Sequence, residues 1–187
     1  MNRRETLQRV ALLMGGAVSA PVMRAVLSGL QPQTRYTPKA LSAQQDRIVT
    51  LISDMIIPVT DTPGAQAAQV NQFIDMLLSD WFKPEERDRF MAGFTQVDER
   101  CQQACGKRFL EAAVEDRAKL LMELDREAIA ARQAGVKETP FFGMLKEMTL
   151  AGYYTSEIGI TQELHYDPAP GYFDGCIPFS QIGRPWA

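Results

Sequence analysis

Apolar residues recur at helical spacing along most of the chain, between residues that start or stop helices. The first such stretch begins at Ser42, which forms a capping-box pattern with Gln45, and it stops before Pro58. A turn at residues 60–64 follows. Further helices are predicted from about Ala65 to Trp81, from Pro84 to Gly106, from Val114 to Ala134, and from Phe141 onward, with a short last helix that Ser156 caps and that runs through Leu164.

Each predicted helix has one apolar face. The face of the second is Val70, Phe73, Ile74, Leu77, Leu78 and Trp81, and that of the fifth is Phe141, Phe142, Leu145 and Met148. No stretch alternates with a period of two for long enough to predict a strand. We therefore expect an all-α bundle of five to six helices over residues 42–164, preceded by a linker over residues 31–41.

The last 23 residues, 165–187, break this pattern. They contain four prolines, three glycines and five aromatic residues. The proline spacing argues against a helix, so we expect an extended arm. Its aromatic side chains would bury large apolar areas, either on the chain's own bundle or on another chain.

Residues 1–30 are expected to hold an export signal and the start of the linker. Arg3 and Arg4 precede a fourteen-residue uncharged run from Val10 to Met23, too short for the roughly 20 residues that span a bilayer. The paired arginines resemble a twin-arginine signal, whose pathway carries folded proteins. The alternative is an amphipathic helix with an incidental arginine pair. A small-x-small cleavage pattern ends at Ala20, but Pro21 disfavours cleavage there.

Composition narrows the chemistry. With 45% hydrophobic residues the chain can form a packed core, and a net charge of −3 argues against a nucleic-acid partner. One histidine and three cysteines, with no zinc or haem motif, leave little room for a metal centre or haem, and nucleotide and nucleophile motifs are absent. We expect no catalytic, cofactor-binding or metal-binding residue. The alternative is a free-standing enzyme or binding protein with a site near His165, using Glu163 and Asp167.

The three cysteines, Cys101, Cys105 and Cys176, are candidates for a disulfide. Cys101 and Cys105 lie one helical turn apart, where a disulfide is strained inside a regular helix. Cys176 could pair with either of them, or with a partner subunit. Three reduced thiols are the remaining alternative.

Two blocks of sequence resemble the gluconate 2-dehydrogenase subunit 3 family. The first runs from Asp54 to Ala65 (DMIIPVTDTPGA) and continues through residues 70–81. The second, more specific block comprises Gly152 to Gly159 (GYYTSEIG) and residues 170–178 (PGYFDGCIP). Together with the N-terminal signal, the blocks extend the resemblance over nearly the whole chain.

The resemblance implies a non-catalytic small subunit of a periplasmic sugar dehydrogenase complex. The implied partner is a large flavoprotein of the glucose-methanol-choline type that holds FAD and acts on gluconate or glucose, often with a cytochrome c subunit. The twin-arginine export machinery would carry the flavoprotein together with this chain, which would also support its maturation. The expected partner interface consists of Gly152, Tyr153, Tyr154, Thr155, Ser156, Glu157, Gly159, Tyr172, Cys176 and Trp186.

Overall fold

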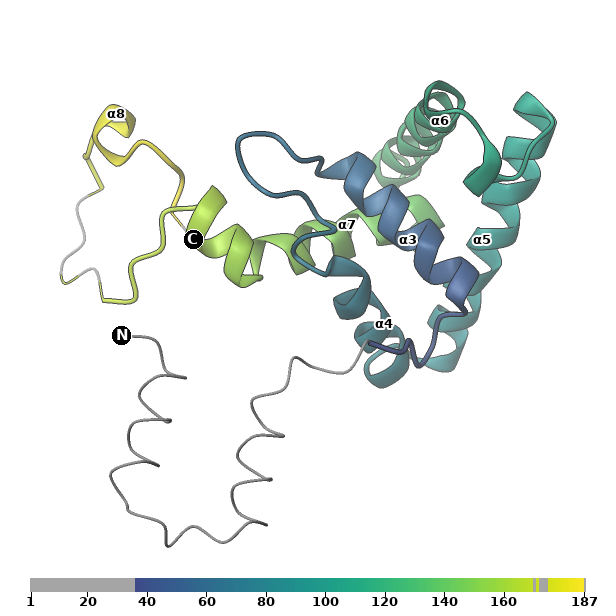
Figure 1. Cartoon of the computed structure of the whole chain (residues 1–187), viewed down its shortest axis with the longest axis horizontal. Helices are drawn as coiled ribbons and strands as arrows, with labels where there is room; N and C mark the ends of the chain where they lie inside the picture. Colours follow the sequence, from purple (N-terminus) through teal and green to yellow (C-terminus); the bar gives the residue numbers. More distant parts are fainter. Residues whose placement is uncertain (1–35, 170, 172–174, 187) are drawn as a thin grey trace, which may run out of the picture. The chain divides into compact units, whose positions relative to one another are not determined.

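The computed structural model describes residues 36–169, 171 and 175–186, and it divides the chain into units over residues 1–37 and 38–187. The predicted signal arginines, Arg3 and Arg4, and the predicted interface residue Tyr172 lie outside the described residues. In the second unit every regular element among the described residues is a helix, the helices being joined by loops and turns, and none is a strand (Figure 1). The elements are α3 Ala43–Ile56, α4 Val70–Asp80, α5 Pro84–Cys105, η1 Phe109–Glu111, α6 Val114–Gln133, α7 Phe141–Tyr154, η2 Gly159–Glu163 and α8 Phe179–Ile182. The all-α prediction is confirmed.

Helix α3 begins as the sequence predicts. The side chain of Ser42 accepts a hydrogen bond from the backbone N–H of Gln45, and the Gln45 side chain accepts one from the N–H of Ser42. This capping box satisfies two backbone donors that the first turn leaves without partners. The helix ends at Ile56, two residues before Pro58.

The start of α4 differs from the prediction. The helix begins at Val70, not near Ala65, and the residues between them form turns. The N–H of Ala65 is held by the carbonyl of Ile57 at 2.9 Å, and Gln69 adopts a left-handed φ of 55°, which interrupts a helix. The placement of Trp81 on the apolar face of this helix is also wrong, because Trp81 follows the last helical residue and its side chain is 77% exposed.

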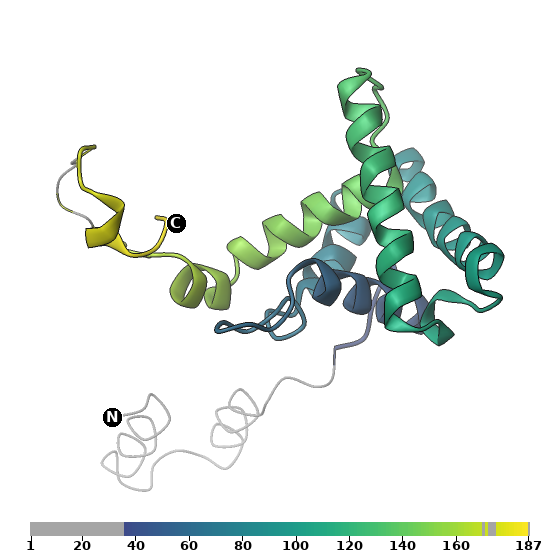
Figure 2. The same ribbon diagram turned by 90° about the horizontal axis from the view of Figure 1, so that it is seen from above.

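Helix α5 has the predicted ends. Pro84 occupies its first turn, and Gly106, with a φ of 75°, terminates it in a left-handed conformation that costs glycine little. Helix α6 follows after η1 and lies across α7, which is clear from above (Figure 2). An exposed ion pair between Arg100 and Glu127, 2.7 Å apart, joins α5 to α6 and raises the pKa of the guanidinium.

Helix α7 is the central element, since it packs against α3, α4, α5 and α6. Its four predicted core residues are all buried: Phe141, Phe142, Leu145 and Met148. The ring of Phe141 packs against α5 at Gly93. A Cβ on Gly93 would lie 2.2 Å from this ring, so the close packing requires a glycine there. Helix α7 also bonds to α3, through a buried hydrogen bond of 3.1 Å between the hydroxyls of Ser53 and Thr149.

The predicted extended arm over residues 165–187 is not supported. Helix α8 comprises Phe179–Ile182, with Pro178 at its N-cap position and Gly183, at a φ of 76°, at its C-cap position. A β-bridge then pairs His165 with Trp186, with the N–H of His165 donating to the carbonyl of Pro185 at 2.7 Å. The described part of this segment thus returns to its own starting point. Among the described residues, no helix is long and apolar enough to cross a membrane.

Candidate partner interface

The two sequence blocks are about ninety residues apart in the chain, and the fold brings them together. Tyr153, at the end of α7, is fully buried, and its hydroxyl donates to the carbonyl of Pro63 at 2.7 Å. Close by, the hydroxyl of Thr62 donates to the carboxylate of Glu163 in η2 at 2.7 Å. These two bonds attach the loop of residues 57–65 to the end of α7 and to η2, and we call the assembly the loop–helix junction.

The loop side of the junction depends on Gly64. A Cβ at this position would lie 2.8 Å from the carbonyl oxygen of Ile57 and 2.9 Å from Oδ1 of Asp54. The chain therefore passes closer to α3 than any side chain would permit. Oδ1 of Asp54 is buried and accepts no hydrogen bond within the described part of the chain.

The helix side depends on two further glycines and a serine. Gly152 faces the ring of Phe73, with 2.7 Å between the ring and the position of a Cβ. Gly159 passes even closer to the backbone of Tyr153, and a Cβ there would lie 2.0 Å from its carbonyl oxygen. Ser156 makes this turn, since its hydroxyl donates to the carbonyl of Tyr153 at 2.6 Å and accepts from the N–H of Gly159 at 3.0 Å.

The predicted interface residues therefore divide by exposure. Gly152, Tyr153 and Gly159 are buried within the junction and Ser156 is half-buried. The exposed members are Tyr154, Thr155, Glu157, Cys176 and Trp186. Val59, at 69% exposure in the loop, adds an apolar side chain that the prediction omitted. The buried residues shape the surface, and the exposed ones lie on it.

The C-terminal segment adds exposed aromatic side chains: Tyr166 at 54%, Phe179 at 62% and Trp186 at 48%. The rings of Trp186 and His165 meet edge to face, with their centroids 4.2 Å apart, and Arg184 donates to the carbonyl of Gln162. The segment is thus fixed to η2 while its aromatic residues stay accessible.

The three residues proposed for an alternative site do not converge. His165 contacts Trp186, Glu163 accepts from Thr62, and Asp167 accepts from the N–H of Ala169 at 3.0 Å. In the described part of the chain, no group of three or more candidate ligands could hold a metal ion.

Asp75 is a structural residue that the sequence did not distinguish from other acids. It is fully buried in α4, and its carboxylate accepts three successive backbone N–H groups, those of Lys39, Ala40 and Leu41, at 2.8 to 2.9 Å. It holds the end of the linker against the bundle.

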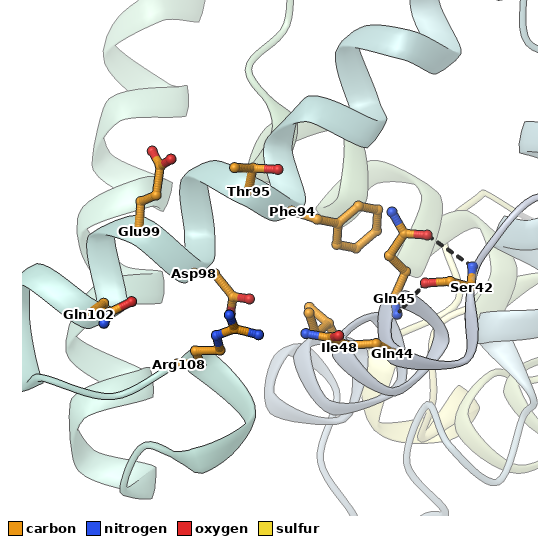
Figure 3. A pocket seen from close by; sticks show the side chains of 10 residues that line it. All are labelled: Ser42, Gln44, Gln45, Ile48, Phe94, Thr95, Asp98, Glu99, Gln102 and Arg108. Carbon is orange, nitrogen blue, oxygen red and sulfur yellow. Dashed lines mark hydrogen bonds between the residues drawn. The ribbon is translucent and has the colours of Figure 1, made fainter.

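A polar pocket of about 340 Å³ lies between the start of α3 and the middle of α5 (Figure 3). Asp98 and Arg108 point into it and Glu99 lies at its edge, with Phe94 and Ile48 at its apolar side. Asp98 also accepts the N–H of Phe109 at 3.0 Å, which fixes η1. None of the predicted interface residues lines this pocket.

Cys101 and Cys105 are both reduced, with their sulfur atoms 3.7 Å apart in the last turn of α5. Neither forms the candidate disulfide with Cys176, which is exposed. Burial raises the pKa of the Cys101 thiol to about 11, with further contributions from Cys105, Asp98 and Asp116.

Comparison with known proteins supports the first sequence block and residues 152–159 of the second. The family model for gluconate 2-dehydrogenase subunit 3 matches residues 43–171, which include the loop–helix junction and most of the bundle. No curated protein and no solved structure matches the chain. Because the family match covers more than half of its length, the chain belongs to the gluconate 2-dehydrogenase subunit 3 family and is a subunit of that kind of dehydrogenase complex.

Proposed function

We propose that this chain is the non-catalytic small subunit of a periplasmic, flavin-dependent sugar dehydrogenase. Its partner is an FAD-containing flavoprotein of the glucose-methanol-choline type, joined in some complexes by a cytochrome c subunit. The chain carries the twin-arginine signal at Arg3 and Arg4. The flavoprotein is exported with it in the folded state, and the chain stabilises that folded state.

The observation that carries the proposal is the loop–helix junction. The family match ends at residue 171, so it includes the first block and residues 152–159 of the second. Polar groups of the junction hold backbone in place, since the hydroxyl of Tyr153 donates to the carbonyl of Pro63 and that of Ser156 accepts from the N–H of Gly159. A junction built in this way supports a binding surface of fixed shape. The exposed residues Tyr154 and Trp186 supply aromatic side chains of the kind that anchor protein interfaces.

The assembly test is purification of the tagged chain from its native host. We expect a flavin-containing large subunit in stoichiometric amount. The double variant Tyr154→Ser with Trp186→Ser is expected to lower recovery of that subunit at least tenfold, because aromatic anchors contribute about 2 kcal/mol or more each. Trp81→Ser is the matched control, since Trp81 is an exposed aromatic residue at the end of α4. Recovery without any flavoprotein refutes the proposal.

The export test uses Arg3→Lys with Arg4→Lys. Both this chain and the flavoprotein are expected to remain in the cytoplasm, as shown by fractionation and dehydrogenase activity. Continued export of the flavoprotein would refute co-transport while leaving the assembly result intact.

A further inference from the structure

The last turn of α5 contains two thiols that face each other. The sulfur atoms of Cys101 and Cys105 are 3.7 Å apart, and the sulfur of Cys105, as a donor, lies 3.1 Å from the carbonyl oxygen of Cys101. Cys101 is buried and Cys105 is half-buried, so one side of the pair is open to solvent. Neither thiol belongs to the loop–helix junction.

Helical geometry disfavours a disulfide between these two residues. Residues four apart on a helix have Cβ atoms about 5–6 Å apart, whereas a disulfide needs about 3.5–4.5 Å. Closing the bond would unwind the turn that ends at Gly106. A metal–thiolate bond is about 2.3 Å long, so an ion between two sulfurs separates them by about 4.6 Å. The observed separation is 3.7 Å, and we expect rotation of the two side chains to widen it by about 1 Å with the helix intact.

The donor set selects the ion. The described residues offer no third ligand, since no group of three or more metal-binding side chains occurs among them. Zn²⁺ requires four ligands, whereas Cu(I) prefers soft thiolates and accepts two of them in a line. Asp98 on α5 and Asp116 on α6 add negative potential at Cys101, and the C-terminal end of α5 adds the negative pole of its dipole. These charges attract a cation.

We propose that Cys101 and Cys105 form a two-coordinate site for Cu(I). The ion binds between the two sulfurs, so that two copper–sulfur bonds form and two S–H bonds break. Both protons go to solvent, and neither copper nor sulfur changes oxidation state. Cys105 is the first ligand to bind, because it is the more exposed of the two residues.

The test uses the full chain with its partner subunits attached, reduced and kept free of oxygen, and titrated with Cu(I) in competition with bicinchoninate. We expect uptake of one ion for each copy of this chain, release of two protons, and protection of Cys101 and Cys105 from alkylation. Cys105→Ser is expected to lose this uptake at least a hundredfold in affinity. Cys176→Ser, which removes the exposed thiol, is expected to retain it.

Several results would overturn the proposal. Uptake that survives Cys105→Ser, or that is not stoichiometric, identifies an adventitious ion only. A Cys101–Cys105 disulfide that forms readily, with no ion uptake after reduction, shows that the turn prefers oxidation. Alkylation of the wild-type protein, read by mass spectrometry, tests the site even if a variant fails to fold. Equal labelling of Cys101 and Cys105 with and without copper would contradict the site.

Discussion

Replacement of Asp75 by asparagine is expected to destabilise the bundle strongly, although the change removes a single charge. Oδ1 of this buried carboxylate accepts the N–H groups of Ala40 and Leu41, and Oδ2 accepts that of Lys39. An asparagine side chain has the same shape but only one acceptor oxygen. Whichever way its amide is turned, an NH₂ group must face at least one backbone N–H.

The magnitude follows from the bond types. Hydrogen bonds to a charged group contribute about 1.5–3 kcal/mol, against about 0.5–1.5 kcal/mol for neutral ones, so the two bonds that remain weaken by about 1 kcal/mol each. The third bond is lost and leaves a backbone donor without an acceptor, at a cost of about 1–3 kcal/mol. The expected loss in the free energy of unfolding is therefore about 3–5 kcal/mol, a large share of the 5–15 kcal/mol typical of a domain.

The assay is chemical or thermal unfolding followed by circular dichroism, with the full chain in its complex if the isolated chain aggregates. Asp80→Asn is the matched control, because Asp80 is an exposed acid at the end of the same helix, and we expect a change within about 0.5 kcal/mol. Asp75→Ala should be at least as damaging as Asp75→Asn. If Asp75→Asn unfolds within about 1 kcal/mol of the control, the three bonds do not hold the linker as described.

Three further changes test other parts of the structure. Gly64→Ala is expected to cost about 1–3 kcal/mol, because the added Cβ would lie 2.8 Å from the carbonyl oxygen of Ile57. A melting temperature equal to that of the wild type would contradict this packing. Tyr153→Phe removes the bond to Pro63 and is expected to cost about 1 kcal/mol in unfolding while increasing hydrogen exchange in the loop; unchanged exchange would show that the bond does not fix the loop. Burial raises the pKa of the Cys101 thiol from 9.0 to about 11, so the unfolded chain loses this proton at a lower pH than the folded chain. The stabilising contribution of the protonated thiol is therefore complete below pH 9 and is lost between pH 9 and 11. Cys101→Ala should make the free energy of unfolding, measured by urea titration, fall less over this range, and an equal fall in both proteins would contradict the raised pKa.

Most of the helices follow from local sequence rules. The capping box at Ser42, the proline at the start of α5 and the left-handed Gly106 at its end lie where the sequence predicts them. Each depends on residues within about four positions, so the neighbouring sequence alone specifies the outcome. Local rules also explain why the prediction for the second helix is too long. Ala65 bonds to Ile57 across a loop, and the spacing of apolar residues carries no information about that bond.

The C-terminal segment shows a second limit of local rules. Four prolines correctly argue against a long helix, but they do not prevent the four-residue helix α8 between Pro178 and Gly183. They also do not reveal that Trp186 returns to His165, since the pairing depends on turns whose combined direction no single residue encodes.

The sequence by itself determined the all-helical class, the ends of α3 and α5, the buried face of α7 and the family to which the chain belongs. The tertiary structure alone decided the roles of Asp75 and Tyr153. Asp75 binds backbone 34 to 36 residues away, and Tyr153 binds a carbonyl 90 residues away. The physical reason is that a buried polar group must find a partner once water is excluded, and which partner lies within reach is known only when the helices have packed.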